Sequence, residues 1–268
     1  MQMEFYKPKN ELLQRYIEGY YFISHLENSP SLHYWTFPNN FFIVSVNANT
    51  DLEIADNKII IKQSQQKKLT ANYVSRYTTP IEVICEGAVK EITIYFKPLG
   101  INHFIANADE LVNQKSAMDF NPFPDFAETM ATILQQKDRE LQQNQLEQYW
   151  LSKICNAQLT LIEKIIADVE ADLKIEEIAS KHNFSRQYLN KLFTQALGKS
   201  PTEYRKIHRF RNAIAKRKQT DSLTELSYES LFYDQSHLIK DFKKLAKVSP
   251  NSFFKKVDTA KEYIWLFI

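Results

Sequence analysis

The sequence predicts an α+β protein of two domains, with a strand-rich first half and an all-helical second half. Short β-branched and aromatic segments recur up to about residue 105, and helical periodicity replaces them from residue 126. One nine-residue frame then occurs twice, as FTQALGKSP at 193–201 and as FKKLAKVSP at 242–250. A length of 268 residues also favours two domains over one.

The first half begins with an expected helix over residues 11–19, followed by short strands bounded by Asn, Asp, Gly or Pro. The strand candidates are FFIVSV (41–46), LEIAD (52–56), KIIIKQ (58–63), IEVICE (81–86) and EITIYF (91–96). Many short strands at near-regular spacing are typical of a sandwich or a barrel.

Helical periodicity follows in two stretches. Residues 126–153 predict paired helices outside the sheet, and Pro122 and Pro124 mark the change of pattern. Residues 156–171 predict a further amphipathic helix. We place the domain boundary near Cys155, which gives domains of residues 1–155 and 156–268.

Composition narrows the class of protein. The chain is 44% hydrophobic and 25% charged, which is typical of an ordinary globular protein. No signal peptide and no run of about 20 apolar residues is visible, so we expect a cytoplasmic protein with no membrane partner. Cys85 and Cys155 lie far apart, which predicts buried thiols and no disulfide framework or zinc spacing.

Charge is distributed unevenly along the chain. Residues 181–256 carry 17 Lys or Arg against 6 Asp or Glu, a net charge of +11, whereas the whole chain carries +2 and the remainder therefore −9. A basic block suggests a polyanionic partner, although a solvated helical surface explains the same count.

The repeated frame belongs to a longer repeat. IEEIASKHNFSRQYLNKLF precedes the end of the first copy, and LTELSYESLFYDQSHLIKDF precedes the end of the second. In each copy a small residue, Ala179 or Ser227, follows an apolar one, and a polar turn leads to a second helix. This pattern predicts two helix-turn-helix units, with Ser185 as the N-cap of the second helix in the first unit.

The second helix of each unit has one apolar and one polar face. Leu189 and Phe193 face inward in the first unit, as Leu238 and Phe242 do in the second. Ile239 is the one apolar residue on the outward face of the second unit, where it either contacts a thymine methyl group or packs against a neighbouring helix. Short, polar and basic outward faces are suited to the major groove of DNA.

The SP dipeptide that closes each frame predicts the start of the next helix, with Ser200 and Ser249 as N-caps. The helix after Pro201 has no breaker for about 17 residues and spans roughly 25 Å. A connector of this kind holds two recognition helices at a fixed separation, so that one chain reads two successive major grooves.

At these residues the sequence resembles the AraC family of bacterial transcription regulators, over about residues 175–254. The family commonly has glycine where this chain has Asn183 and Leu231, and alanine where it has Ser227. The resemblance implies base-reading roles for Arg186, Gln187, Asn190, Lys191, Gln235, Ser236, Ile239 and Lys240. Position and charge assign phosphate contacts to Ser185, Thr194, Lys199, Arg205, Arg209 and Lys243.

The resemblance also implies that the first domain is a cupin-like β-barrel that binds a small effector, forms a homodimer, or does both. Tyr21, His33, Trp35 and Arg76 are our candidates for an effector pocket, although such aromatic residues more often form the barrel core. His25, His33 and His103 are too scattered for a cupin metal site, and we expect no cofactor and no enzymatic activity.

These observations predict a sequence-specific DNA-binding regulator. By resemblance it acts as an activator that contacts RNA polymerase and responds to an effector or to dimerisation. Two alternatives remain open: a small-molecule carrier or enzyme whose basic half is only a scaffold, and a nonspecific architectural DNA-binding protein.

Overall fold

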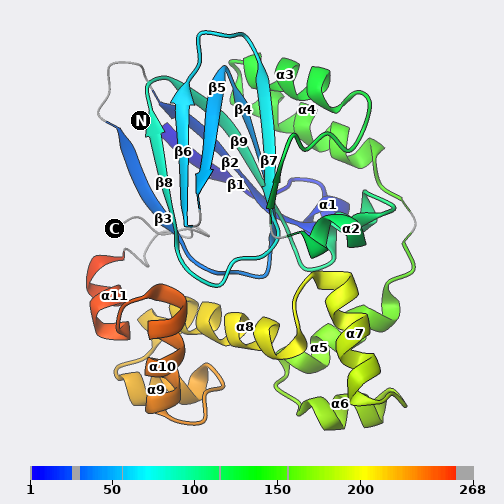
Figure 1. The fold of residues 1–268 in the computed structure, drawn as a ribbon, viewed down its shortest axis with the longest axis vertical. Coiled ribbons are helices and arrows are strands. Elements are labelled where there is room, and N and C mark those ends of the chain that lie inside the picture. Colours follow the sequence, from blue (N-terminus) through cyan, green and yellow to red (C-terminus); the bar gives the residue numbers. More distant parts are fainter. Residues whose placement is uncertain (1, 26–30, 56, 115, 156, 258–268) are drawn as a thin grey trace. The chain divides into compact units, whose positions relative to one another are not determined.

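The chain forms two compact units, and both are drawn in Figure 1. The computed structural model describes residues 2–25, 31–55, 57–114, 116–155 and 157–257. The first unit comprises Met1–His33, Phe41–Ser75 and Val83–Gln158. The second comprises Tyr34–Asn40, Arg76–Glu82 and Leu159–Ile268, so it takes two short segments from the N-terminal half of the sequence.

Strands of the described residues form two sheets. The six-stranded sheet has the order β1(Gln2–Tyr6), β2(Ile17–His25), β9(Val89–Phe96), β4(Phe42–Ala48), β7(Leu69–Val74) and β10(Ser116–Met118). Its neighbouring strands are all antiparallel. The four-stranded sheet has the order β3(Leu32–Thr36), β8(Ile81–Glu86), β6(Lys58–Gln63) and β5(Thr50–Ala55).

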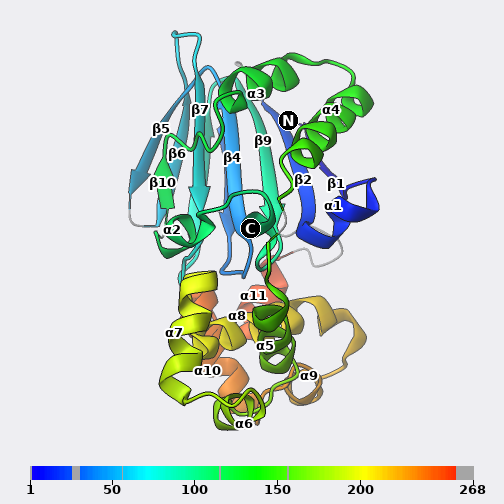
Figure 2. The same cartoon turned by 90° about the vertical axis from the view of Figure 1, so that its right-hand side faces the viewer.

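One face of the six-stranded sheet is apolar and lies under two helices, α3(Phe126–Gln135) and α4(Arg139–Ser152) (Figure 2). Phe22, Ile92 and Val46 are opposite one another in three adjacent strands and share this face. They belong to one core cluster with Met130 of α3 and Trp150 of α4, and all five side chains are buried. Burial of these large side chains is the main force that holds the helices on the sheet.

The opposite face of the same sheet carries several polar side chains, most of them buried. Tyr21, Thr93 and Ser45 are opposite one another, and Asn47 and Glu91 form the next pair along the strands. Thr93 Oγ1 donates a 2.5 Å hydrogen bond to Glu91 Oε1, whereas Glu91 Oε2 and both amide atoms of Asn47 have no partner among the described residues. Burial raises the pKa of Glu91, and hydrogen bonds from Thr93 and Ser45 lower it in part.

Short helices complete the first unit, and the second unit consists mainly of helices. The short helices of the first unit are α1(Glu11–Tyr16), a 3-10 turn at Gly100–His103 and α2(Ala108–Asn113). The helices of the second unit are α5(Thr160–Glu170), α6(Ile175–Lys181), α7(Arg186–Leu197), α8(Pro201–Lys216), a 3-10 turn at Arg217–Gln219, α9(Leu223–Glu229), α10(Gln235–Ala246) and α11(Pro250–Lys256). No helix in the described part of the chain has the length and apolar character needed to cross a bilayer.

The predicted α+β organisation is confirmed, with its strands divided between two sheets. The expected strands at 58–63 and 81–86 have the predicted bounds, and those at 41–46, 52–56 and 91–96 correspond to β4, β5 and β9 with shifted ends. The paired helices at 126–153 are α3 and α4, and the helix expected at 156–171 is α5. Residues 56 and 156, at the ends of two of these expected elements, lie outside the described residues.

Five strands were not predicted, namely β1, β2, β3, β7 and β10. The helix expected over residues 11–19 was wrong in its extent, because it ends at Tyr16 and β2 begins at once. In β2 the residues 19–23 are buried on both faces, so the strand lacks the alternation of polar and apolar residues that identifies a half-buried strand.

Replacement of Glu91 by Gln tests the polar face. Because burial raises the pKa of Glu91, the folded protein binds this proton more tightly than the unfolded chain does. The stability of the fold therefore falls as the pH rises from the ordinary pKa of a glutamate towards the raised pKa of Glu91. Glu91→Gln therefore increases the unfolding temperature at pH 8, with a smaller gain at pH 4.5. Glu86→Gln, at an exposed position, serves as the control in thermal unfolding. A gain equal at both pH values contradicts the prediction.

Candidate nucleic-acid interface

The second unit contains two helix pairs of equal size. Helices α6 and α9 each have 7 residues, and α7 and α10 each have 12. Ala179 of α6 and Ser227 of α9 are buried at corresponding positions, where a small side chain allows the second helix to cross closely. Ser227 also satisfies its hydroxyl locally, because Oγ donates to the carbonyl of Thr224 at 2.6 Å. Both pairs thus form the predicted helix-turn-helix units.

The two turns have the same hydrogen bonds although their sequences differ. The N–H of Phe184 donates to the carbonyl of Ala179 at 2.8 Å, and the N–H of Phe232 donates to that of Ser227 at 2.8 Å. The residues before these Phe residues are left-handed, with φ of 57° at Asn183 and 64° at Leu231. This is the Schellman arrangement that ends many helices. Leu231 therefore adopts a left-handed turn conformation that is usually built with glycine.

N-caps fix where the helices begin. Ser185 Oγ accepts a 3.1 Å bond from the N–H of Tyr188, and Asp234 Oδ1 accepts a 2.7 Å bond from that of His237. Ser200 and Ser249 cap α8 and α11 in the same way, at 3.2 and 3.3 Å, and each is followed by proline. The predicted role of both SP dipeptides is confirmed.

Polar and basic side chains form the outward faces of α7 and α10. The exposed ones are Arg186, Gln187, Asn190 and Lys191 on α7, and Gln235, Ser236, Lys240 and Lys243 on α10. The two helices can therefore offer hydrogen-bond donors and acceptors to base edges.

Several of these groups also have partners within their own unit. Arg186 pairs with Glu176 at 2.8 Å, and Gln235 Oε1 accepts a 2.9 Å bond from Thr224. Lys191 and Lys240 form no ion pair among the described residues. Two predicted contact residues are only half-exposed, Thr194 and Ile239. Ile239 packs against the core of the second pair, which is the second of the two roles weighed for it.

Helix α8 runs between the two pairs (Figure 1). Its 16 residues give a length of about 24 Å. Tyr204 near its start contacts Phe193 of α7, with ring centroids 5.5 Å apart, and Phe210 contacts Phe242 of α10 at 4.8 Å. Because both contacts are buried, the connector is attached to each recognition helix by an aromatic pair.

Among the predicted phosphate contacts, the one at Lys199 was wrong because this residue is buried, whereas those at Arg205 and Arg209 stay predictions. Lys199 is buried, with 3% of its surface exposed, and desolvation lowers its pKa to about 8. Glu203 nearby raises that pKa in part, and Arg76 lowers it. Arg205 and Arg209 both pair with Asp172 at the start of the turn before α6, so their guanidinium groups hold this turn.

The four candidates for an effector pocket belong to both units, two to each. Tyr21 is buried against Phe5, with ring centroids 4.9 Å apart. His33 is exposed on β3, whereas Trp35 of that strand packs against the core of the second unit. Arg76 forms a bidentate pair with Glu203, at 2.8 and 2.6 Å. The assignment of these four residues to an effector pocket stays a prediction.

Sequence reasoning also missed the acidic anchors of the unit. Asp168 of α5 accepts from Lys181 at 2.6 Å and lies 2.9 Å from His182. Desolvation raises the pKa of Asp168, and these two contacts together lower it below its ordinary value. Asp241 of α10 lies 3.3 Å from Lys206. The sequence shows carboxylates before and within the basic block, but only the fold identifies which cations they neutralise.

A family described as a helix-turn-helix domain matches residues 178–256, which span both helix pairs. Residues 178–256 therefore carry a helix-turn-helix domain. The HTH-type transcriptional regulator MtrA of Neisseria gonorrhoeae is 30% identical to the chain over 97 residues. These make up 36% of this chain and 32% of MtrA, so the chain matches about a third of that relative's length.

Solved structures are also similar to the chain. ToxT from Vibrio cholerae is 13% identical, with a TM-score of 0.47 over 87% of this chain and 98% of ToxT. The C-terminal domain of AraT from Geobacillus stearothermophilus is 24% identical, with a TM-score of 0.36 over 40% of this chain and 93% of that domain. The assignment of a helix-turn-helix domain rests on the match of residues 178–256.

Glycine and alanine at position 231 test the left-handed turn. A non-glycine residue in this conformation costs about 1 kcal/mol, so Leu231→Gly is expected to be more stable than Leu231→Ala by about that amount. At Lys191, an exposed helical position, we expect the opposite order, with glycine about 1 kcal/mol less stable than alanine. Urea unfolding of the four variants measures both differences. The same order at both positions would argue against strain at Leu231.

Lys199→Met tests the buried ammonium group. The pKa of Lys199 is about 8 in the folded protein against an ordinary 10.5, so the unfolded chain binds more protons between these values and wild-type stability rises with pH across them. The stability advantage of Lys199→Met therefore shrinks by roughly 2–3 kcal/mol between pH 7.5 and pH 10.5. Chemical unfolding at both pH values measures this change, with exposed Lys240→Met as the control. A difference that does not vary with pH refutes it.

Proposed function

We propose that the protein is a sequence-specific DNA-binding transcription regulator. The observation that carries this proposal is the pair of helix-turn-helix units with equal lengths, equal turns and outward polar faces, joined by one connector helix with a buried apolar stripe. Two such faces on one rigid unit suit two successive major grooves, which are about 34 Å apart along the duplex. A nonspecific DNA-binding protein needs only positive charge.

The residue roles follow from exposure. Arg186, Gln187, Asn190 and Lys191 of α7, and Gln235, Ser236 and Lys240 of α10, are assigned to base edges. Ser185, Thr194 and Lys243 are assigned to phosphates, which position the helices without reading sequence. Ile239 is half-buried, so it contributes at most an apolar edge to a thymine methyl group.

The remainder of the proposal concerns regulation. We assign effector binding or dimerisation to residues 1–155, DNA binding to residues 156–268, and the cytoplasm as the location. By family resemblance the protein activates transcription through RNA polymerase and has no catalytic activity. An effector increases DNA affinity only if it binds the DNA-competent state more tightly than the other state.

Selection of bound duplexes from a randomised DNA pool tests this function. At near-physiological salt, the purified chain is expected to enrich a motif of two blocks about one helical turn apart. Asn190→Ala relaxes the block read by α7 and Lys240→Ala relaxes the block read by α10, each by about 1–3 kcal/mol of discrimination. Lys137→Ala, at an exposed position in the first unit, leaves both blocks unchanged.

Other outcomes separate the alternatives. Binding that falls steeply with salt and enriches no motif supports an architectural protein and refutes sequence reading. Full function in a variant with charge reversal at Lys191 and Lys240 supports a carrier or enzyme with a helical scaffold.

A further inference from the structure

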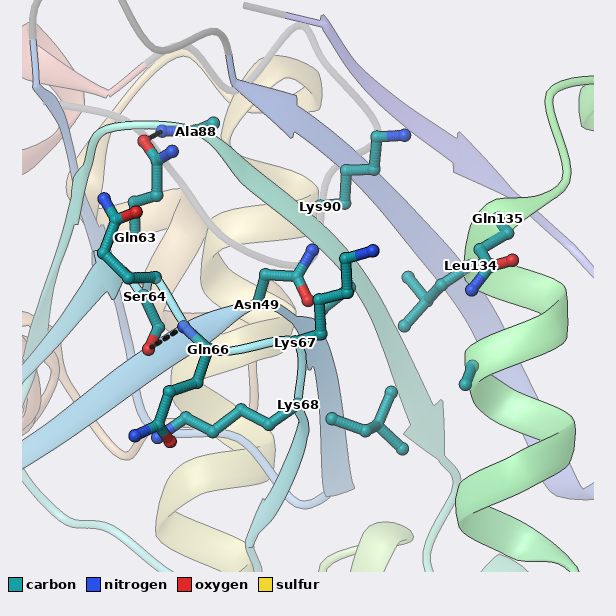
Figure 3. A pocket seen from close by; sticks show the side chains of 14 residues that line it. Asn49, Gln63, Ser64, Gln66, Lys67, Lys68, Ala88, Lys90, Leu134 and Gln135 are labelled. Carbon is teal, nitrogen blue, oxygen red and sulfur yellow. Dashed lines mark hydrogen bonds between the residues drawn. The ribbon is translucent and has the colours of Figure 1, made fainter.

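A cavity of about 720 Å³ lies in the first unit, between one end of the strands and α3. Its walls come from the turn after β4, the loop between β6 and β7, the start of β9, and the last turns of α3 (Figure 3). A volume of this size suits a metabolite. None of the four residues expected to bind an effector lines it.

The charge of this cavity has one sign. Three lysines line it, Lys67, Lys68 and Lys90, and none of its lining residues is acidic. Lys68 is neutralised by an ion pair with Asp51. Lys67 and Lys90 form no ion pair among the described residues, and both are exposed. Two uncompensated ammonium groups that share a concave wall favour an anion between them.

Hydrogen bonds hold part of this polar wall in place. Asn49 has φ of 56°, its N–H donates to the carbonyl of Lys68 at 2.8 Å, and its own carbonyl accepts from the N–H of Ser64 at 2.8 Å. Gln63 Oε1 accepts from the N–H of Ala88 at 2.9 Å, which leaves the side-chain NH₂ of Gln63 as its donor. Hydrogen bonds therefore connect the loop that carries Lys67 to the turn after β4.

The cavity also has apolar lining residues. Leu134 and Ala131 of α3 line the cavity, together with Leu69 at the start of β7. Figure 3 shows Leu134 and Gln135 on the helix, across from Lys67 and Asn49. A ligand seated here has one charged end, hydrogen-bonding groups and an apolar part.

We propose that this cavity binds a small organic anion, whose carboxylate or phosphate group is held by Lys67 and Lys90 while its carbon skeleton lies against Leu134 and Leu69. Gln63 and Asn49 supply hydrogen bonds to its remaining polar groups. This inference concerns ligand binding to the first unit and holds or fails independently of DNA reading by the second.

Calorimetric titration of the full chain tests the site with two pairs of probes, each an anion and its neutral analogue. The pairs are glucose 6-phosphate with glucose, and 3-phenylpropionate with 3-phenylpropanol, so the result also distinguishes a phosphate from a carboxylate. At least one anion is expected to bind more tightly than its analogue. Lys67→Gln/Lys90→Gln lowers that affinity by at least about tenfold, because two charge-assisted contacts are lost.

The control is Lys7→Gln/Lys137→Gln, which removes the same charge from exposed positions of the first unit outside the cavity. It leaves the affinity unchanged. Both double variants are expected to unfold at the wild-type temperature, since the replaced lysines are exposed. The proposal is overturned if neither anion binds more tightly than its neutral analogue, or if the two double variants lose affinity equally. Selection of DNA by the cavity variant shows separately whether the second unit still reads sequence.

Discussion

A six-residue turn at the end of α6, repeated at the end of α9, is the constraint on which the second unit depends. In each turn the N–H of a buried or half-buried Phe reaches back to the carbonyl of a small buried residue, and a left-handed residue between them reverses the chain. This hydrogen bond sets the direction in which α7 and α10 leave their turns. The small side chains of Ala179 and Ser227 then decide how closely the helices cross. The orientation of the outward faces of α7 and α10 follows from this direction and from how closely the helices cross.

The connector α8 makes the two turns act together. Its buried stripe contacts the first pair through Tyr204 and the second through Phe210. Separating either pair from the connector would expose these large aromatic side chains to water, which is unfavourable. A hinge between the pairs would require a break in this helix, yet it continues from Pro201 to Lys216. The faces of α7 and α10 therefore keep one separation, which is the property that reading two grooves requires.

The sequence predicted the second unit far better than the first for a physical reason. Helix caps, the SP dipeptides and the 3.6-residue periodicity are local, so Ser185, Ser200 and Ser249 could be assigned from their neighbours alone. The strand β2 could not, because it is buried on both faces and its pairing with β9 joins residues about 70 positions apart. Tyr21 shows the same limit, since its aromatic character indicated burial without indicating which neighbours it contacts.

Charge count was a weaker guide than charge partners. The basic block of residues 181–256 is neutralised in part by carboxylates that precede it: Asp172 holds Arg205 and Arg209, and Asp168 holds Lys181. Cations paired in this way stabilise the turn before α6 and contribute little field to a distant phosphate. Lys191 and Lys240, which no described carboxylate pairs, carry full charges on the outward faces of the two recognition helices. Because cations of the connector are paired within the unit, the positive potential is concentrated on α7 and α10. DNA is therefore attracted most strongly in the orientation that also brings its base edges to these two helices.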